Sequence, residues 1–171
     1  ALELYQSILD EQLETIEFAS NKYKKLDDVL IINKDCIIAY QVKDIGANFT
    51  YNNFINSDTT SLFEGCFNDW KSLNSEYPNK EIRACYVSNQ KPSSHDKIRS
   101  FSEEKPASFK QFKEEFWEKI NSKELDVNSI STNWKSTFNE LKKLSKSSDK
   151  ELIAFIQSFR FVLEDEYIKV K

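Results

Sequence analysis

Only two glycines, Gly46 and Gly65, occur in this chain of 171 residues. A Walker A loop, a G-x-G-x-x-G dinucleotide turn and the G-x-S-x-G nucleophile elbow all need glycines at fixed, close spacing. Gly46 and Gly65 are too far apart in the sequence to supply any of these motifs. The chain therefore cannot bind phosphate through a glycine-rich loop, and an α/β-hydrolase is excluded.

Histidine and cysteine usage removes most transition-metal sites. His95 is the only histidine, so H-E-x-x-H zincins and His-rich metal sites are excluded. Cys36, Cys66 and Cys85 lack C-x-x-C spacing, which argues against a cysteine zinc site and favours a reducing, cytoplasmic setting. No apolar stretch reaches 18 residues, so we expect no membrane-spanning segment. A metal ion held by oxygen ligands remains compatible with the composition.

Hydrophobic periodicity predicts a mixed N-terminal half. The apolar residues from Leu2 to Leu13 recur at helical spacing, and later segments alternate between strand and helix patterns. In chain order we expect a helix at 2 to about 13, strands at 15–19, 28–32 and 36–42, a helix at 61–73, a strand at 82–87 and a loop at 88–106.

The C-terminal part is predicted to be helical to near its end. Ser108 with Gln111, and Ser148 with Glu151, have the spacing of capping boxes, and the last helix is expected to run through Phe159. We therefore expect an α/β or α+β core at 1–106 and a helical C-terminal subdomain of the same domain at 107–171. Because the helical pattern begins at once at the first residues, we expect the chain to be a fragment of a longer protein.

Three polar residues in the expected hairpin could share one surface. Gln41 and Lys43 point to the same face of their strand because side chains alternate. If the connection is Lys34-Asp35, or the four residues Asn33–Cys36, the residue numbers of each cross-strand pair add up to 69. Asp28 then lies opposite Gln41. A three-residue loop would instead place Asp27 there, and the sequence does not decide between these loops.

This set of residues suits divalent-metal chemistry. A carboxylate (Asp28), an amide oxygen (Gln41) and the backbone carbonyl of Val42 are hard oxygen ligands of the kind that Mg²⁺ prefers. An ammonium beside them (Lys43) can orient or deprotonate an attacking water. The combination predicts phosphodiester hydrolysis. The same spacing of residues also occurs by chance in ordinary chains, where the aspartates are turn residues and the lysine is exposed to solvent.

In this order of elements the chain resembles the PD-(D/E)xK nuclease superfamily, in its Gln-x-Lys variant. The resemblance rests on Leu26-Asp27-Asp28-Val29, on Ala39-Tyr40-Gln41-Val42-Lys43, and on Tyr86-Val87-Ser88-Asn89 with Pro92-Ser93. It covers about residues 1 to 95, and more narrowly the chain looks like the endonuclease effector domains of bacterial anti-phage defence and restriction proteins. It implies an α/β, restriction-endonuclease-like α-β-β-β-α-β core with a helical C-terminal extension.

The resemblance also implies a function and a site. The activity would be metal-dependent endonucleolytic cleavage of double-stranded DNA, with Mg²⁺, or Mn²⁺ in its place, bound by Asp28 and Gln41, and with Lys43 as the catalytic lysine. The superfamily often adds an upstream acidic residue, for which Glu17 is the first choice and Glu3 or Glu14 the others. The usual Pro-Asp pair is absent, since Leu26-Asp27 stands where its proline would be. Sensor or NTPase domains are the expected partners.

Charge distribution bears on how DNA would bind. The segment 80–113 carries eight basic and four acidic side chains, whereas residues 1–20 carry five acidic and no basic ones. The net charge is −4, so strong DNA binding is expected to need a homo-oligomer or further domains. Two rival hypotheses are a non-catalytic interaction module that docks a partner through 108–162 and an unrelated α+β binding protein with a plain polar surface at the hairpin.

Overall fold

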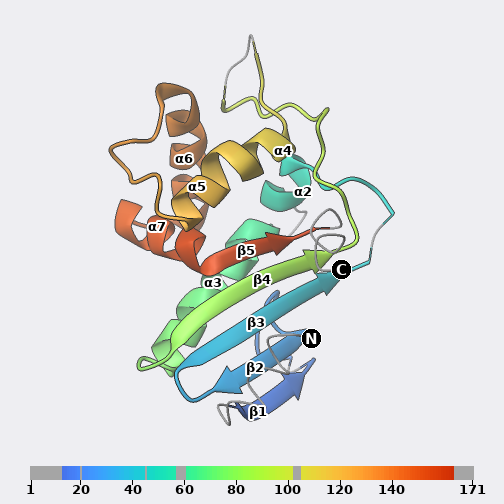
Figure 1. Ribbon diagram of the computed structural model, residues 1–171, viewed down its shortest axis with the longest axis vertical. Helices are drawn as coiled ribbons and strands as arrows, with labels where there is room; N and C mark the ends of the chain where they lie inside the picture. The colour runs from blue at the N-terminus through green and yellow to red at the C-terminus, as the bar shows by residue number, and fades with distance from the viewer. Residues whose placement is uncertain (1–12, 20, 45, 57–60, 102–104, 164–171) are drawn as a thin grey trace.

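A five-stranded mixed sheet organises the protein in the computed structural model, which describes residues 13–19, 21–44, 46–56, 61–101 and 105–163 (Figure 1). The strands lie in chain order, with β1 (Leu13–Phe18) at one edge and β5 (Phe159–Val162) at the other. β1, β2 (Val29–Asn33) and β3 (Cys36–Lys43) are antiparallel, and β4 (Glu81–Ser88) and β5 continue parallel to β3. The expected mixed α/β class is confirmed at this level.

The β2–β3 hairpin has the register in which paired positions sum to 69. Val29 pairs with Tyr40, and Ile32 pairs with Ile37 at the turn. β2 ends at Asn33 and β3 begins at Cys36, so the connection is Lys34-Asp35, one of the alternatives left open by the sequence. This register continues past Val29 to set Asp28 across from Gln41.

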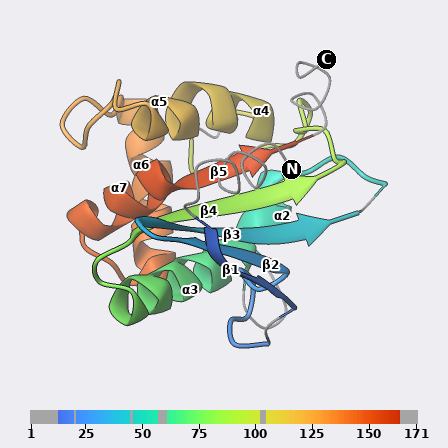
Figure 2. The ribbon, with the colours of Figure 1, turned by 60° about the horizontal axis from the view of Figure 1, so that its bottom comes forward.

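One face of the sheet is covered by α3 (Leu62–Glu76), as Figure 2 shows. The apolar stripe of this helix is buried against that face of the sheet, and Ser61 caps its first turn by accepting the Glu64 N–H at 3.0 Å. On the opposite face, Ile31, Ile38 and Cys85 form a second, smaller buried cluster. Both the helix expected at 61–73 and the strand expected at 82–87 are confirmed with slightly longer bounds. Cys85 is thus a core thiol.

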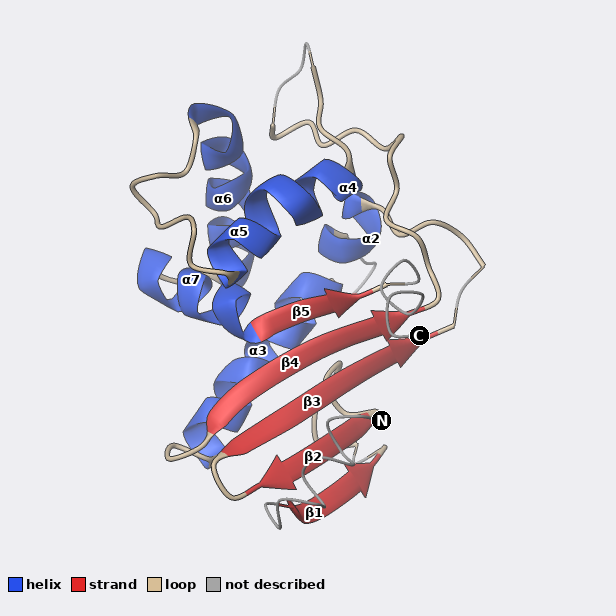
Figure 3. Cartoon of the chain, viewed as in Figure 1, coloured by secondary structure: helices blue, strands red, loops and turns tan. Residues whose placement is uncertain are grey.

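The helices of the C-terminal part gather beside β5 (Figure 3). Their bounds are α4 (Phe109–Gln111), a π-helical segment η1 (Phe112–Trp117), α5 (Glu118–Asn121), α6 (Thr132–Ser145) and α7 (Asp149–Ser158). The capping boxes at Ser108 and Ser148 are confirmed.

The sequence prediction was wrong at the end of the last helix. Phe159 was expected to continue it, but α7 ends at Ser158 and Phe159–Val162 forms β5, paired with Ala84–Val87 of β4. In this stretch Phe159 and Phe161 are buried and Arg160 is exposed, which is the two-residue period of a strand. The C-terminal part therefore supplies a strand to the sheet in addition to its helices.

Two other elements differ from expectation. α2 (Tyr51–Ile55), a short helix with a complete capping box at Thr50, was not predicted. The helix expected at 2 to about 13 lies outside the described residues except for Leu13, which instead begins β1. Among the described residues, no helix has the length and apolar character needed to cross a bilayer.

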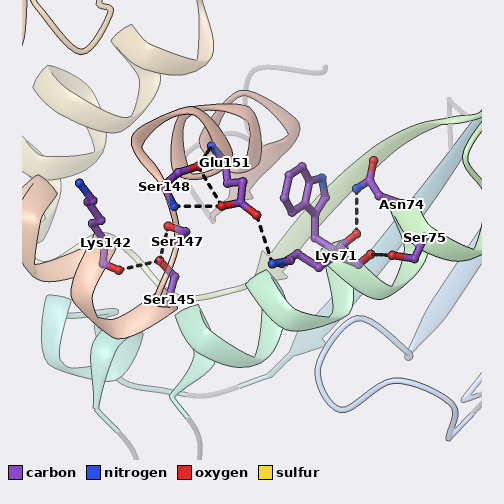
Figure 4. A network of polar contacts seen from close by, with 9 residues as sticks. Lys71, Asn74, Ser75, Lys142, Ser145, Ser147, Ser148 and Glu151 are labelled. Atoms are coloured by element: carbon purple, nitrogen blue, oxygen red, sulfur yellow. Dashed lines mark hydrogen bonds and ion pairs between the residues drawn. The ribbon is translucent and has the colours of Figure 1, made fainter.

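A polar network joins α3 to the α6–α7 corner (Figure 4). The Glu151 carboxylate accepts the Ser148 N–H at 2.9 Å and the Ser148 hydroxyl at 2.8 Å, and it receives Lys71 from α3 at 3.2 Å. In order of size, these Ser148 contacts and Lys71 lower the pKa of Glu151 from 4.5 to about 2. The ionised form of Glu151 therefore stabilises the first turn of α7 and connects it to Lys71 of α3.

Because the folded-state pKa lies below the unfolded one, this stabilisation is present above pH 4.5 and is lost as the pH falls towards about 2. We expect Glu151→Gln to lower the free energy of unfolding at neutral pH. This difference from the unmodified protein should become smaller as the pH falls from 4.5 towards about 2. Urea unfolding at a series of pH values measures it. Glu114→Gln, at an exposed glutamate that caps no helix, serves as the control, and a deficit of Glu151→Gln that is independent of pH would contradict the assignment.

Candidate functional site

Asp28, Gln41 and Val42 meet at the end of the hairpin remote from its turn. The Gln41 side-chain amide donates from Nε2 to Oδ2 of Asp28, and the Val42 backbone N–H donates to the same oxygen at 2.6 Å. Gln41 is only 3% exposed, so the polar contact lies at the edge of the core. The structure thus brings together two of the three predicted side chains through direct bonds.

Lys43 completes the predicted set on the same face. It lies two residues beyond Gln41 on β3, and its neighbour in the parallel ladder is Ser88 at the end of β4. Gln41 and Lys43 both line a cavity of about 250 Å³ at this end of the sheet. The cavity also receives side chains from α2, from the start of α3 and from the segment before β2; the lining includes Lys25, Asn53, Asn56, Leu62, Tyr86 and Gln90.

The structure distinguishes the two neighbouring aspartates. Asp28 carries the bonds to Gln41 and Val42, as the register that sums to 69 requires. Burial raises the pKa of Asp27, and the nearby Asp28 and Asp69 carboxylates add to this rise, while Lys43 opposes it. Asp27 therefore lies near the charges of Asp28 and Lys43, but the side-chain bond of Gln41 goes to Asp28.

The upstream glutamates are placed differently. Glu17 pairs with Leu30 in the β1–β2 ladder, on the face shared with Asp28, but its charge acts on Lys22, Tyr23 and Tyr77 near the end of α3. A catalytic role for Glu17 stays a prediction.

The other two choices do not strengthen the site. Glu14 lies near the hairpin turn and pairs with Lys80 at 2.6 Å, at the end of β2 opposite to Asp28. Glu3 lies outside the described residues.

The donor atoms at this site suit a hard cation. Asp28 offers carboxylate oxygens, Gln41 an amide oxygen and Val42 a backbone carbonyl, which is the ligand chemistry of Mg²⁺ rather than of Zn²⁺. Within the described residues, no three His, Cys, Asp or Glu side chains are grouped to share an ion. A cation here would therefore depend on the amide, the carbonyl, water and substrate oxygens to complete its shell.

The sequence analysis missed Lys25 and the α2 asparagines as cavity residues. Asn53 and Asn56 lie at a helix that carried no clear periodic pattern. For Lys25 a signal was present, because a glycine inside a helical pattern often marks a close approach of another segment. Gly65 is such a glycine, and a Cβ at this position would overlap Cγ of Lys25.

Within the described residues, ion pairs engage four of the eight basic side chains of the segment 80–113. Lys80, Arg83, Lys110 and Lys113 pair with Glu14, Glu81, Glu114 and Glu118, respectively. Asp96, in the polar loop with His95, accepts the N–H groups of Tyr51 and Phe109, each at 2.8 Å, and so joins α2 to α4. The paired basic residues and Asp96 thus form contacts within the protein surface. The candidate site therefore remains at the ends of β3 and β4.

No protein-family model matches the chain, and comparison with curated proteins also gave no match. Any functional assignment therefore depends on the geometry of the site and on the sequence resemblance.

Proposed function

We propose that this chain is a Mg²⁺-dependent endonuclease domain that hydrolyses phosphodiester bonds in double-stranded DNA, on a PD-(D/E)xK-like core. The observation that carries the proposal is that Asp28 contacts Gln41 directly while Lys43 lines the same cavity as Gln41. Alternation along β3 and the hairpin register put these groups on one face. A carboxylate, a carboxamide and an amine so arranged match the needs of metal-assisted hydrolysis.

Each residue has a definite role in this proposal. Asp28, Gln41 and the Val42 carbonyl would hold the cation, which would neutralise charge on the phosphate and lower the pKa of a bound water. The Gln41 amide now directs its nitrogen at Asp28, so a half-turn about its terminal torsion would present the oxygen to a shared ion. Lys43 would orient or deprotonate the attacking water from the same face.

The biological setting follows from the sequence resemblance alone. We place the domain as the effector of a cytoplasmic bacterial anti-phage defence or restriction protein, controlled by sensor or NTPase domains. The net charge of −4 supports a need for homo-oligomerisation or those further domains in DNA binding.

Plasmid cleavage tests the proposal. We expect supercoiled DNA to be nicked or linearised with Mg²⁺ or Mn²⁺, and to stay intact with a chelator. Lys43→Ala should slow cleavage at least about 100-fold, the usual contribution of general acid–base catalysis. Lys135→Ala, at an exposed lysine of α6, is the matched control and should cleave normally. Cleavage that needs no metal, or that Lys43→Ala leaves unchanged, would contradict the proposal.

A second candidate function is a non-catalytic interaction module on the same scaffold. The observation that favours it is that, among the described residues, no three His, Cys, Asp or Glu side chains are grouped so that they could hold a metal ion. Such a module would leave plasmid DNA intact under every metal condition.

A further inference from the structure

Lys25 lines the same cavity as Gln41 and Lys43, although it comes from the segment before β2. Neither Lys25 nor Lys43 forms an ion pair with a side chain in the described part of the chain. Two ammonium groups therefore border one cavity, and no carboxylate of the residues that the structure describes is bound to either. A cavity bordered in this way attracts an anion that approaches from solvent.

The backbone of Lys25 is fixed by a buried carboxylate on α3. Oδ2 of Asp69 accepts the Lys25 N–H at 2.6 Å and the Leu26 N–H at 3.0 Å. Asp69 is only 6% exposed, so these charge-assisted bonds are shielded from water. The position of Lys25 relative to the helix is therefore set before any ligand arrives.

The side chain of Lys25 packs against Gly65, which lies one helical turn before Asp69 on α3. Its stem passes over Gly65, where an added Cβ would overlap Cγ of Lys25. Glycine inside a helix is unfavourable relative to alanine, and Gly65 has no left-handed backbone conformation to explain it. Gly65 and Asp69 are four residues apart and share one face of α3. This face therefore holds both the backbone and the stem of Lys25.

We propose that Lys25 is a phosphate-binding residue, which holds a backbone phosphate of the nucleic acid in the cavity beside the Asp28–Gln41 pair. This inference deepens the proposed function and rests on it for the identity of the ligand. Lys25 would fix the strand relative to the metal site through a charge-assisted contact, whereas Lys43 acts on the water. An interaction module that bound nucleic acid without cutting it would use Lys25 in the same way.

Binding of a short fluorescein-labelled DNA duplex, with Ca²⁺ in place of Mg²⁺, tests the inference by fluorescence anisotropy. We expect Lys25→Ala to weaken binding about tenfold, and the slope of log K against log salt to fall by about 0.9, as for one lost phosphate contact. Lys25→Arg should retain the slope. Lys135→Ala, in α6, should bind as the unmodified protein does.

Gly65→Ala provides an independent variant because it preserves every charge. The new Cβ would push the Lys25 stem aside, so we expect the same loss of affinity as in Lys25→Ala, with no further loss in the double variant. Circular dichroism checks that the variants are folded. If Gly65→Ala does not fold, Lys25→Ala and Lys25→Arg decide the outcome.

The results separate this inference from the nuclease proposal. Unchanged affinity and salt slope in Lys25→Ala overturn the inference, even if Lys43→Ala abolishes cleavage. Loss of duplex binding in Lys25→Ala supports it, even if the unmodified protein cuts no DNA. Absence of duplex binding by the unmodified protein even at low salt, where phosphate contacts are strongest, also overturns it.

Discussion

Replacing Asp28 with asparagine is expected to abolish detectable DNA cleavage while leaving the fold intact. Asparagine has the same shape, and its oxygen can still accept the Val42 N–H and the Gln41 amide that Asp28 accepts now. The charge that attracts a divalent cation is lost, however. Metal assistance contributes several kcal/mol to such reactions, so we expect cleavage to slow by about 1,000-fold.

Metal binding gives a second readout for the same variant. Calorimetric titration with Mn²⁺ should show affinity reduced by at least about 100-fold, since even changes to groups that only support metal ligands cost 10- to 100-fold. Asp35→Asn is the matched control, at an exposed aspartate in the turn of the same hairpin. Equal Mn²⁺ affinity in Asp28→Asn and the unmodified protein would remove Asp28 from the metal site.

The strands and helices were predictable where a local pattern fixed them. β2 and β3 are short and rich in Val and Ile, and α3, α4 and α7 begin directly after Ser61, Ser108 and Ser148, whose side chains cap them. β5 was not predictable in this way, because its four residues continue the helical spacing of α7. Pairing with β4, which lies far away in the sequence, overrides that local preference.

The site was predictable to the extent that it depends on one hairpin. Alternation put Gln41 and Lys43 on one face, but the choice between Asp27 and Asp28 needed the loop length. The structure supplies it with the Lys34-Asp35 connection. Gly65 indicated that some other segment approaches α3, but the sequence could not identify that segment as Lys25, because its position depends on packing against Gly65 and Asp69. Contacts between segments that are far apart in the chain produce no periodic pattern in the sequence.

α2 shows how far tertiary packing can determine a short element. Its five residues are too few for a helix that is stable by itself. Phe54, at its buried side, lies within aromatic contact of rings from α3, α4, η1 and β5. The two nearest of these rings, Phe161 at 5.1 Å and Trp117 at 5.3 Å between centroids, belong to the C-terminal part of the chain. α2 thus connects the cavity wall to the C-terminal core.

Phe54→Ala is therefore expected to be among the most destabilising single substitutions in the protein. Phe54 is fully buried, and removing its ring leaves a cavity whose aromatic walls belong to several elements and cannot close together. We expect the free energy of unfolding to fall by about 3–5 kcal/mol. Chemical denaturation followed by tryptophan fluorescence measures the change, because Trp117 borders the new cavity.

The same substitution at an exposed ring is the control. Phe18 on β1 is 71% exposed, so Phe18→Ala should change stability by no more than about 0.5 kcal/mol. Because Asn53 and Asn56 flank Phe54 and line the cavity with Lys43, loss of the ring should also loosen that wall of the site. A Phe54→Ala protein as stable as Phe18→Ala would mean that α2 is not an integral part of the core, and that the cavity wall it forms is only loosely held.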